Sequence, residues 1–300
     1  MPNLVIVGTV AFDSVKTPFG SAERTLGGSA VYAGVAASFF SKPGIVSIVG
    51  TDFPEESMAF LKSRGIDTAG IKREVGETFF WKGEYGLDIN VAKTLETDLN
   101  VLEKFRPELP KEYRSAEFVF LGNIDPELQL KVLGQVKKPK LVIADTMNYW
   151  IESKPDKVLE IVKKADICLM NDAEARQLFK TSNLVAASKE ILKLDSDLAI
   201  IKKGEHGALL STSRGSFVAP AYPLENVVDP TGCGDSFAGA MIGFLAREGG
   251  LDEDLMRKAL IYGSTVASFN AEGMGLERLK SLTMEEINQR FEEFREIVRF

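Results

Sequence analysis

The residues with the clearest chemical potential lie in the segment 229–240, which reads DPTGCGDSFAGA. Asp235 directly follows a Gly-Cys-Gly turn and leads into a run of small and apolar residues that is typical of a closely packed, buried helix. A carboxylate at the edge of a core is costly unless a partner or a reaction uses it. The position of Asp235 therefore needs an explanation.

Two explanations are open for Asp235. It could cap the helix, because aspartate accepts amide hydrogen bonds at a helix N-terminus and complements the helix dipole. Alternatively, the backbone N–H groups of Gly232, Cys233 and Gly234 could bind an anion, which the same dipole favours. A carboxylate beside that anion would repel it unless the carboxylate had a task, such as accepting a proton from a nucleophile. Cys233, at the helix N-terminus, could be a reactive thiol with a lowered pKa, or its side chain could pack inward and be unreactive.

The composition limits the possible partners and cofactors. The chain has 300 residues, of which 45% are hydrophobic and 26% charged, and its net charge of −7 comes without the basic stripe that nucleic acid requires. The two cysteines, Cys168 and Cys233, and the single histidine, His206, are too few for a disulfide scaffold or for a cysteine or histidine metal site. No segment resembles a signal peptide or a membrane-spanning helix. We expect a cytoplasmic protein that binds a small molecule, with no nucleic-acid or membrane partner.

Alternating strands and helices must position these residues. Short apolar runs that predict buried strands occur at 4–8, 43–50, 116–122, 140–145, 167–171 and 197–204, and helical patterns lie between them. This alternation predicts an α/β fold with a mostly parallel central sheet and helices on both faces. Ligands of such sheets bind at the carboxyl ends of the strands. Several polar residues fall just after predicted strands, namely Asp13, Asn123, Asp145, Asn171 and Lys203.

Two extended segments interrupt this alternation. Residues 78–97 predict two strands around a turn, and residues 10–26 are also extended and polar. Together they predict a small antiparallel sheet that acts as a lid, because the aromatic residues Phe79, Phe80 and Trp81 need a surface to cover. The alternative is a hairpin whose aromatic residues fill a small core of their own. No linker divides the chain, so we expect one domain over its whole length, residues 1–300, including the lid segments.

Short motifs along the chain occur in the order found in a known family. They are Asp13 in GTVAFDS, the pair Gly27-Gly28, an Asn-x-x-Glu pattern at Asn171 and Glu174, a Gly-x-x-Gly pattern at Gly204 and Gly207, and DPTGCGDSFAGA. The chain thereby resembles the ribokinase-like, PfkB-type carbohydrate kinases, whose C-terminal signature is Asp-x-Thr-Gly-Ala-Gly-Asp, with Cys233 where alanine is usual. That signature is highly specific, the other motifs are individually weak, and together they span nearly the whole chain. The chain has no Gly-Lys dipeptide for a Walker-type phosphate loop.

The resemblance implies a ribokinase-like fold and an ATP-dependent kinase that transfers the γ-phosphate to a hydroxyl group, with Mg²⁺ as a cofactor. Asp235 would be the base, and the anion hole would be formed by Gly232, Cys233 and Gly234. Mg²⁺ and phosphate-bound water would be organised by Asn171 and Glu174, with Glu174 holding the metal through water. The resemblance implies nucleotide contacts for Gly204, Gly207, Thr231 and Asn270, and acceptor contacts for Asp13, Gly27, Gly28 and Asp235. Lys203 either contacts a nucleotide phosphate or is a solvated lysine at the end of a strand, and Tyr32 is expected to contact the acceptor. A monovalent cation such as K⁺ would lie at Asp229 and Thr231, and the lid strands could pair in a homodimer.

The identity of the acceptor stays open at this level. Ribokinase-type members usually carry an asparagine four residues after the second glycine, where it holds sugar hydroxyls, and here that residue is Tyr32. A tyrosine offers one hydroxyl and an aromatic face, which suits a different sugar or a nucleoside whose base can stack. A sugar or sugar-like acceptor is the main prediction, and a nucleoside is the alternative. A binding-only protein would not need Asp235, and a hydride-transferring oxidoreductase would need a glycine fingerprint that is missing after the first strand.

Overall fold

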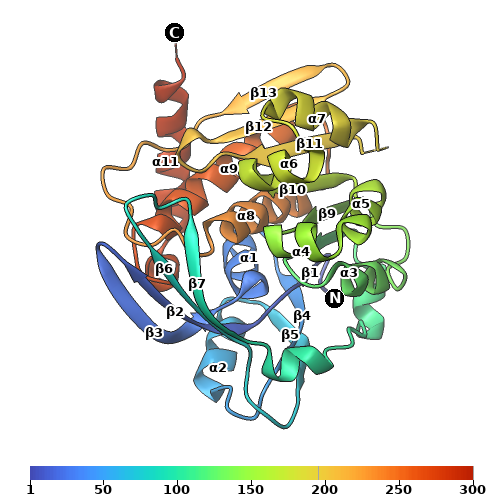
Figure 1. Ribbon diagram of the computed structural model, residues 1–300, viewed down its shortest axis with the longest axis vertical. Helices are drawn as coiled ribbons and strands as arrows, with labels where there is room; N and C mark the ends of the chain where they lie inside the picture. The colour runs from blue at the N-terminus through green and yellow to red at the C-terminus, as the bar shows by residue number, and fades with distance from the viewer. Residues whose placement is uncertain (195, 300) are drawn as a thin grey trace.

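The larger of two β-sheets forms the centre of the fold (Figure 1). The computed structural model describes residues 1–194 and 196–299, and these residues form one sheet of nine strands and one of four. The order in the larger sheet is β13-β12-β11-β10-β9-β8-β1-β4-β5, and all neighbours from β11 to β5 run parallel, which confirms the predicted sheet. Its strands are β1 (Leu4–Val7), β4 (Pro43–Val49), β5 (Asp67–Arg73), β8 (Phe118–Leu121), β9 (Leu141–Asp145), β10 (Ile167–Asn171), β11 (Leu198–Lys202), β12 (Ala208–Thr212) and β13 (Gly215–Ala219).

Helices cover both faces of this sheet, as predicted. One core contains residues of α1 (Ser29–Ser38), α2 (Glu55–Ser63), α8 (Cys233–Glu248), α9 (Glu253–Ala271), α10 (Glu277–Ser281) and α11 (Met284–Ile297). The cores of the other face contain residues of α3 (Pro126–Leu133), α4 (Asn148–Ser153), α5 (Pro155–Lys164), α6 (Asp172–Phe179) and α7 (Leu184–Leu192). In β1, Leu4 and Ile6 join the first core and Val5 and Val7 the opposite one, because successive side chains of a strand point to opposite faces. Within the described ranges, no helix is long and apolar enough to cross a membrane.

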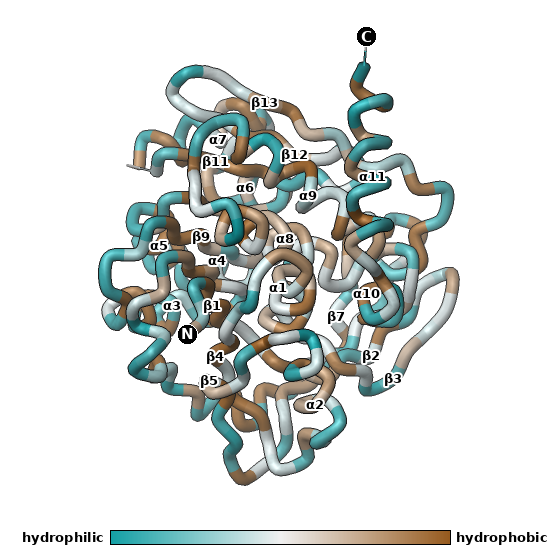
Figure 2. The backbone as a smooth tube through the Cα atoms, turned by 180° about the vertical axis from the view of Figure 1, so that it is seen from behind, coloured by the Kyte–Doolittle hydropathy of each residue, from teal (hydrophilic) through white to brown (hydrophobic). Residues whose placement is uncertain are grey.

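Helices α1 and α8 are in close contact at the centre of the molecule, and the rear view shows few hydrophilic residues along them (Figure 2). A Cβ atom on Gly239 of α8 would lie 2.6 Å from the backbone carbonyl carbon of Ala33 in α1. A Cβ atom on Gly243 would lie 2.8 Å from the Cα atom of Ala37. Protein interiors are close-packed, so a side chain at either position would force the two helices apart. The glycines of α8 therefore set the distance between the helices.

The smaller sheet is the predicted lid, and it is mixed rather than antiparallel. Its strands are β2 (Ala11–Thr17), β3 (Gly20–Gly27), β6 (Phe80–Tyr85) and β7 (Ala92–Asp98), in the order β3-β2-β6-β7. The hairpins β2–β3 and β6–β7 are antiparallel, but β2 and β6 pair in parallel. The prediction of an antiparallel sheet is wrong in this respect, because the first strands of the two hairpins run in the same direction.

Hydrogen bonds tie the lid to the body of the molecule. Asp52 Oδ1 accepts hydrogen bonds from the backbone N–H and the hydroxyl of Thr78, at 2.8 and 2.7 Å, just before β6. At the far end of β2, the hydroxyl of Thr17 donates to the carbonyl of Val228 at 2.8 Å. Because β2 follows the carboxyl end of β1, these contacts hold the lid at the carboxyl edge of the larger sheet.

The close contact of α1 and α8 can be tested by adding one methyl group. Gly239→Ala should lower the free energy of unfolding by about 1–3 kcal/mol, the usual cost of overpacking a core, although alanine is the better helix former. The control is Gly134→Ala after α3, where the added carbon would lie 3.6 Å or more from its neighbours. Denaturant unfolding compares both variants with the wild type. A Gly239→Ala variant as stable as the wild type would contradict the close contact.

Candidate active site

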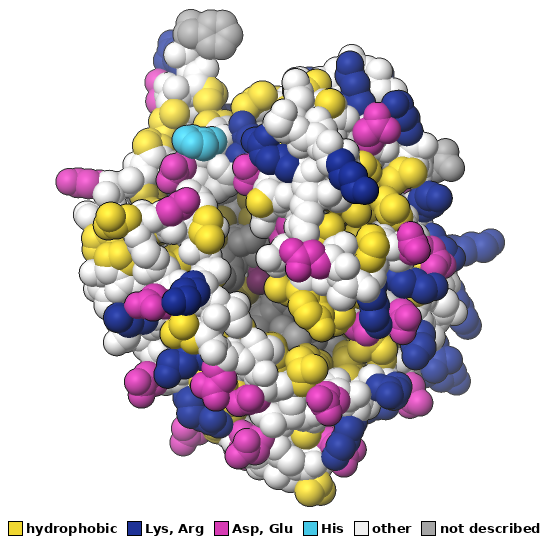
Figure 3. Space-filling model, viewed as in Figure 1, with side chains coloured by type: hydrophobic (Ala, Val, Ile, Leu, Met, Phe, Trp, Pro, Cys, Tyr) yellow, Lys and Arg dark blue, Asp and Glu magenta, His cyan; other side chains and the backbone are white. Residues whose placement is uncertain are grey.

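The carboxyl ends of β9, β10 and β11 converge with the N-terminus of α8 and its entry loop (residues 229–234). β9 ends at Asp145, β10 at Asn171 and β11 at Lys202, and the last two residues are neighbours across the sheet. The same face of the molecule is hollowed at its centre, between the lid and the region of α4 to α6 (Figure 3). Polar side chains from separate segments thus converge at the carboxyl edge, where ligands of parallel sheets bind.

The entry loop brings backbone amides to the start of α8. Gly232 is the N-cap residue, and its φ of 73° is a left-handed conformation that favours glycine. The N–H of Cys233 donates to the carbonyl of Pro230 at 3.2 Å, so this member of the predicted anion hole is already used within the turn. The N–H groups of Gly234 and Asp235 have no acceptor within the described parts of the chain. These two amides, at the positive end of the helix dipole, are free to bind an anion.

Asp235 lies in the first turn of α8, beside these free amides. Its carboxylate receives no hydrogen bond from residues 1–194 or 196–299, so it does not cap its own helix. Burial raises the pKa of this carboxyl group to about 7; the charge of Asp145 adds to the rise, Lys202 opposes it, and Asp13 adds to it. Asp235 is therefore a partly buried acid with a pKa near neutrality, next to two free amides.

Asp145 and Lys202 form a buried ion pair that the sequence analysis missed. The Lys202 ammonium lies 2.6 Å from Oδ2 of Asp145, and the two side chains are 16% and 6% exposed. Burial lowers the pKa of Lys202, but the carboxylates of Asp145, Glu174 and Asp235 outweigh that effect and raise the pKa above its ordinary value. Lys203, the lysine predicted from the sequence to contact the nucleotide, lies beyond the end of β11. The alternation of side-chain direction along β11 was the signal that could have distinguished the two lysines.

Asn171 and Glu174 form a capping box at the start of α6. Asn171 Oδ1 accepts a hydrogen bond from the N–H of Glu174 at 2.8 Å, and Glu174 Oε2 accepts one from the N–H of Asn171 at 2.7 Å. The second oxygen of Glu174 accepts from the Asn171 side-chain amide at 2.8 Å. Burial raises the pKa of Glu174; Asp145 adds to this effect and Lys202 opposes it. Among the described residues, no three acidic, Cys or His side chains are placed so that they alone could hold a metal ion. Carboxylate oxygens such as those of Glu174 are nevertheless donors that suit Mg²⁺ when waters and phosphates supply its other ligands.

Asp13 of β2 lies against the diglycine at the start of α1. Its Oδ2 accepts a hydrogen bond from the N–H of Gly28 at 3.3 Å. Gly28 is the N-cap residue of α1 with a φ of 93°, and a side chain on Gly27 would clash with the Asp13 carboxylate. Burial raises the pKa of Asp13 to about 7; the N–H of Gly28 opposes the rise, and Asp229 adds to it. The diglycine thus allows a buried carboxylate to approach the start of α1.

Tyr32 of α1 lies beneath the entry loop. Its side chain is 1% exposed, and a side chain on Gly232 would clash with its ring. Its hydroxyl has no hydrogen-bond partner in the described parts of the chain, and burial raises its pKa well above the ordinary value. The ring supports the loop from below, and the predicted contact of Tyr32 with the acceptor stays a prediction.

Asn270 and Cys233 connect the entry loop to α9. The buried amide of Asn270 donates to the carbonyl of Thr231 at 2.8 Å and to the sulfur of Cys233 at 3.3 Å. The thiol of Cys233 donates to the carbonyl of Ala267 at 3.5 Å. Burial raises the pKa of this thiol to about 12, so the expected lowering is wrong, because the side chain packs against α9. The predicted contact between Asn270 and a nucleotide stays a prediction.

Asp229 fixes the entry loop to the segment that follows α9. Its side chain is buried, with Oδ1 accepting from the N–H of Thr231 at 2.9 Å and Oδ2 from the N–H of Gly275 at 2.9 Å. Hydrogen bonds between a carboxylate and backbone amides are strong, so Asp229 holds the loop in shape. The monovalent-cation site predicted at Asp229 and Thr231 stays a prediction.

The turn after β11 contains the predicted Gly-x-x-Gly segment. Gly204 and Gly207 have φ values of 53° and 81°, left-handed conformations that favour glycine. The N–H of Lys203 donates to the carbonyl of Gly207 at 2.7 Å and closes the turn. The segment therefore exists as a tight turn at the carboxyl end of β11.

The lid reaches both this turn and the entry loop. A side chain on Gly204 would clash with Asn90, which lies in the turn between β6 and β7. The hydroxyls of Tyr85, at the end of β6, and Thr231 are hydrogen bonded at 3.3 Å. The lid thus spans from the loop at the start of α8 to the turn after β11.

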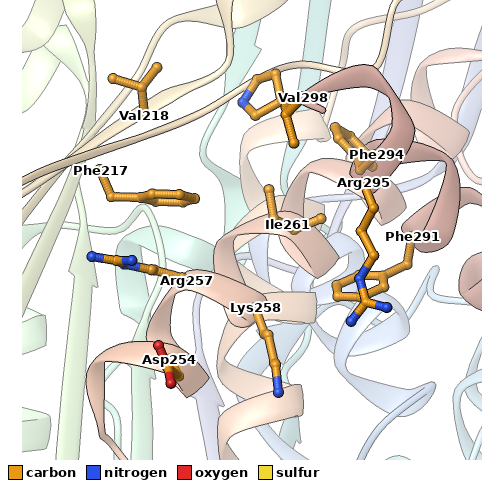
Figure 4. Close-up of a pocket in the computed structure, with 11 residues that line it drawn as sticks. Phe217, Val218, Asp254, Arg257, Lys258, Ile261, Phe291, Phe294, Arg295 and Val298 are labelled. Carbon is orange, nitrogen blue, oxygen red and sulfur yellow. The ribbon is translucent and has the colours of Figure 1, made fainter. Parts of the chain in front are cut away.

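A different cavity, of about 310 Å³, lies between β13, α9 and α11 (Figure 4). Its lining is mainly apolar, with Phe217, Ile261, Phe291 and Phe294, and it also includes Arg257, Lys258 and Arg295. None of the residues of the carboxyl edge lines it. The candidate site is therefore the polar convergence at the carboxyl edge and not this cavity.

Comparisons with known proteins agree with this fold. The family model described as "pfkB family carbohydrate kinase" matches residues 3–281. The chain is 33% identical over 262 residues to the cytidine kinase of Thermococcus kodakarensis, an alignment that covers 84% of this chain and 92% of that protein. Its fold is similar to the crystal structure of a nucleoside kinase from Methanocaldococcus jannaschii, with a TM-score of 0.77, 21% identity and coverage of 97% and 98% of the two chains. Ribokinase from Thermotoga maritima gives a TM-score of 0.76 at 19% identity, with coverage of 98% and 100%.

The two structural similarities establish the ribokinase-like fold. The sequence matches also establish the family to which the chain belongs. The family model spans most of the chain, and the cytidine kinase relative aligns over most of both proteins. The chain therefore belongs to the pfkB family of carbohydrate kinases, and it is a phosphotransferase that acts on an alcohol group.

Proposed function

We propose that this kinase uses ATP to phosphorylate a hydroxyl group of a nucleoside. The observation that carries the proposal is the alignment with the cytidine kinase, which covers 92% of that protein at 33% identity. Tyr32 supports it, since this residue stands where ribokinase-type members usually carry an asparagine that holds sugar hydroxyls. A sugar acceptor was the main prediction from the sequence, and these relatives favour the nucleoside that was its alternative.

Asp235 is the base in this proposal. A phosphoryl group bound to the free N–H groups of Gly234 and Asp235 would lie beside the Asp235 carboxylate, and an acceptor hydroxyl next to both could lose its proton to that carboxylate. A pKa of about 7 suits this task, because a general base is most effective when its pKa is near the working pH. Asp13, placed by Gly27 and Gly28, would accept hydrogen bonds from other hydroxyls of the acceptor.

The remaining residues of the site would hold the nucleotide. Phosphoryl transfer needs positioning and stabilisation of charge more than covalent help from the protein. Asn171 and Glu174 would hold Mg²⁺ through water, and the bound metal would neutralise charge on the phosphates. The nucleotide side of the site would be formed by Lys203, Gly204, Gly207, Thr231 and Asn270.

The lid would keep water away from the reaction. Its contacts with Thr231 through Tyr85 and with Gly204 through Asn90 support a position over the region where acceptor and nucleotide would meet. A closed site strengthens electrostatic interactions and prevents hydrolysis of the phosphoryl donor. This arrangement supports transfer to a small molecule that is enclosed during the reaction.

The proposed acceptor class is tested by ADP release from MgATP with cytidine, uridine, adenosine, inosine, ribose and fructose. We expect kcat/KM for at least one nucleoside to exceed that for ribose by about tenfold or more, since tenfold corresponds to only about 1.4 kcal/mol of additional contact with the base. Higher kcat/KM for a free sugar than for every nucleoside would make the protein a sugar kinase instead.

Asp235→Asn should lower kcat by about 10²–10⁴-fold, the range for loss of a general base, and leave ATP binding unchanged. In the wild type, kcat/KM should fall as the pH decreases below about 7, because the protonated carboxyl group cannot accept a proton, and the variant should show a weaker dependence. Folding raises this pKa from 3.8 to about 7, so the wild type loses stability as the pH rises through that interval. The melting temperature of the variant at pH 8 should therefore be no lower than that of the wild type. Turnover at the wild-type rate would remove Asp235 from the mechanism.

Asp13→Ala should raise KM for the acceptor roughly 10–150-fold, which is the effect of losing one hydrogen bond to a charged group, and leave KM for ATP nearly unchanged. Steady-state kinetics with each substrate varied in turn gives both values. The control is Asp98→Ala, an exposed lid carboxylate on β7, which should change neither KM. An unchanged acceptor KM in Asp13→Ala would mean that Asp13 only shapes the start of α1.

A further inference from the structure

The buried ion pair between Lys202 and Asp145 has no task in the reaction as described so far. Removing two charges from water costs several kcal/mol per ion, and neutral side chains of similar size could fill the same space. Asp145 is firmly held: its Oδ1 accepts from the N–H of Thr146 at 2.9 Å, and its backbone carbonyl accepts from the amide of Gln129 at 2.9 Å. This support fixes Asp145 and, through it, the Lys202 ammonium.

The Lys202 ammonium lies next to the first turn of α8. A Cβ atom on Gly234 would be 3.2 Å from Nζ of Lys202, so the ammonium is beside the free amides of Gly234 and Asp235. An ammonium has three N–H donors, and within the described ranges Asp145 is the only acceptor for them, at 2.6 Å. The remaining donors are charged and largely buried, and they are available where the amides would bind an anion.

The surrounding charges show why a cation is needed at this place. The carboxylates of Asp145, Glu174 and Asp235 all act on Lys202. Without Lys202, their negative charge would repel an incoming phosphate. A compact ammonium suits a phosphoryl group whose charge is spread over three oxygens during transfer.

We propose that Lys202 is a catalytic residue whose ammonium, positioned by Asp145, donates hydrogen bonds to the transferring phosphoryl group together with the N–H groups of Gly234 and Asp235. The proposal rests on the placement of the phosphoryl group at the entry loop given under the proposed function, and it does not depend on the acceptor. Lys202 forms no covalent bond and keeps its proton. The bond from phosphorus to the acceptor oxygen forms, the bond to the oxygen of the leaving ADP breaks, and the acceptor proton moves to Asp235.

The test removes the charge and keeps the packing. In the double variant Lys202→Gln/Asp145→Asn, the ion pair becomes a neutral amide pair, so neither member of the pair is left as a charge without its partner. We expect a melting temperature close to that of the wild type and a kcat reduced about 10²–10³-fold, the usual effect of losing one donor to a transition-state oxyanion. The control Lys140→Gln/Glu117→Gln neutralises an exposed ion pair of 2.8 Å elsewhere on the protein and should leave kcat unchanged.

Ligand binding gives a readout that needs no acceptor. Titration calorimetry with Mg²⁺ compares ADP with a non-hydrolysable ATP analogue on the wild type and the double variant. The affinity for the analogue should fall about tenfold or more beyond any change for ADP, because ADP lacks the γ-phosphoryl group that the charged donor would contact. Equal losses for the two ligands would overturn the proposal.

Kinetics can overturn the proposal in two further ways. If kcat of the double variant stays within about threefold of the wild type, Lys202 is only a counter-ion for Asp145. If the loss of kcat disappears at high pH, where Asp235 is ionised in both proteins, Lys202 acts through the pKa of Asp235 and not on the phosphate. The measurements use whichever acceptor turns over, so a sugar preference would refute the nucleoside proposal and leave this test intact.

Lys202→Arg covers the case in which the double variant does not fold. It keeps a positive charge beside Asp145, and its turnover should exceed that of Lys202→Gln by about tenfold or more, since a guanidinium also binds phosphate oxygens. Equal turnover of the Arg and Gln variants, with both folded, would refute a direct role for the charge.

Discussion

The close contact between α1 and α8 is the constraint on which the site depends. Each helix begins at a glycine with positive φ, Gly28 for α1 and Gly232 for α8, and the α1 backbone leaves no room for a side chain on Gly239. The contact brings both N-termini to the carboxyl edge of the sheet and places the ring of Tyr32 directly under Gly232. If α1 and α8 were farther apart, the ring of Tyr32 would no longer contact the entry loop at Gly232. The geometry of the free amides is therefore decided by close packing several residues away from them.

Buried charge is the second feature that the site requires, and it lowers the stability of the folded protein. Burial raises the pKa values of Asp13, Asp235 and Glu174, so these carboxyl groups reduce the stability of the unliganded protein as the pH rises toward neutrality. Active sites commonly trade stability for reactivity in this way. Lys202, which is paired with Asp145, lies among these carboxylates. Its positive charge reduces the negative electrostatic potential where a phosphate would bind.

The lid joins segments that the central sheet alone would leave apart. β2 carries Asp13 to the start of α1, and β6 carries Tyr85 to the entry loop. The turn between β6 and β7 places Asn90 against Gly204 at the end of the site that we assign to the nucleotide. Because β2 and β6 are hydrogen bonded to each other, the two hairpins form one sheet that contacts both sides of the site.

The sequence by itself determined the α/β architecture, the presence of a lid and the contiguous motifs, because these depend on local patterns. Apolar runs and their period reveal buried strands and helices, and the entry loop with Asp235 or the Asn171–Glu174 capping box lies within a few neighbouring residues. Only the tertiary structure decided the parallel pairing of β2 with β6, the packing of Cys233 against α9, and the ion pair between Lys202 and Asp145. Lys202 and its partner Asp145 are 57 residues apart. Such contacts arise when the strands assemble into a sheet, and no local pattern specifies which distant side chain a residue will meet.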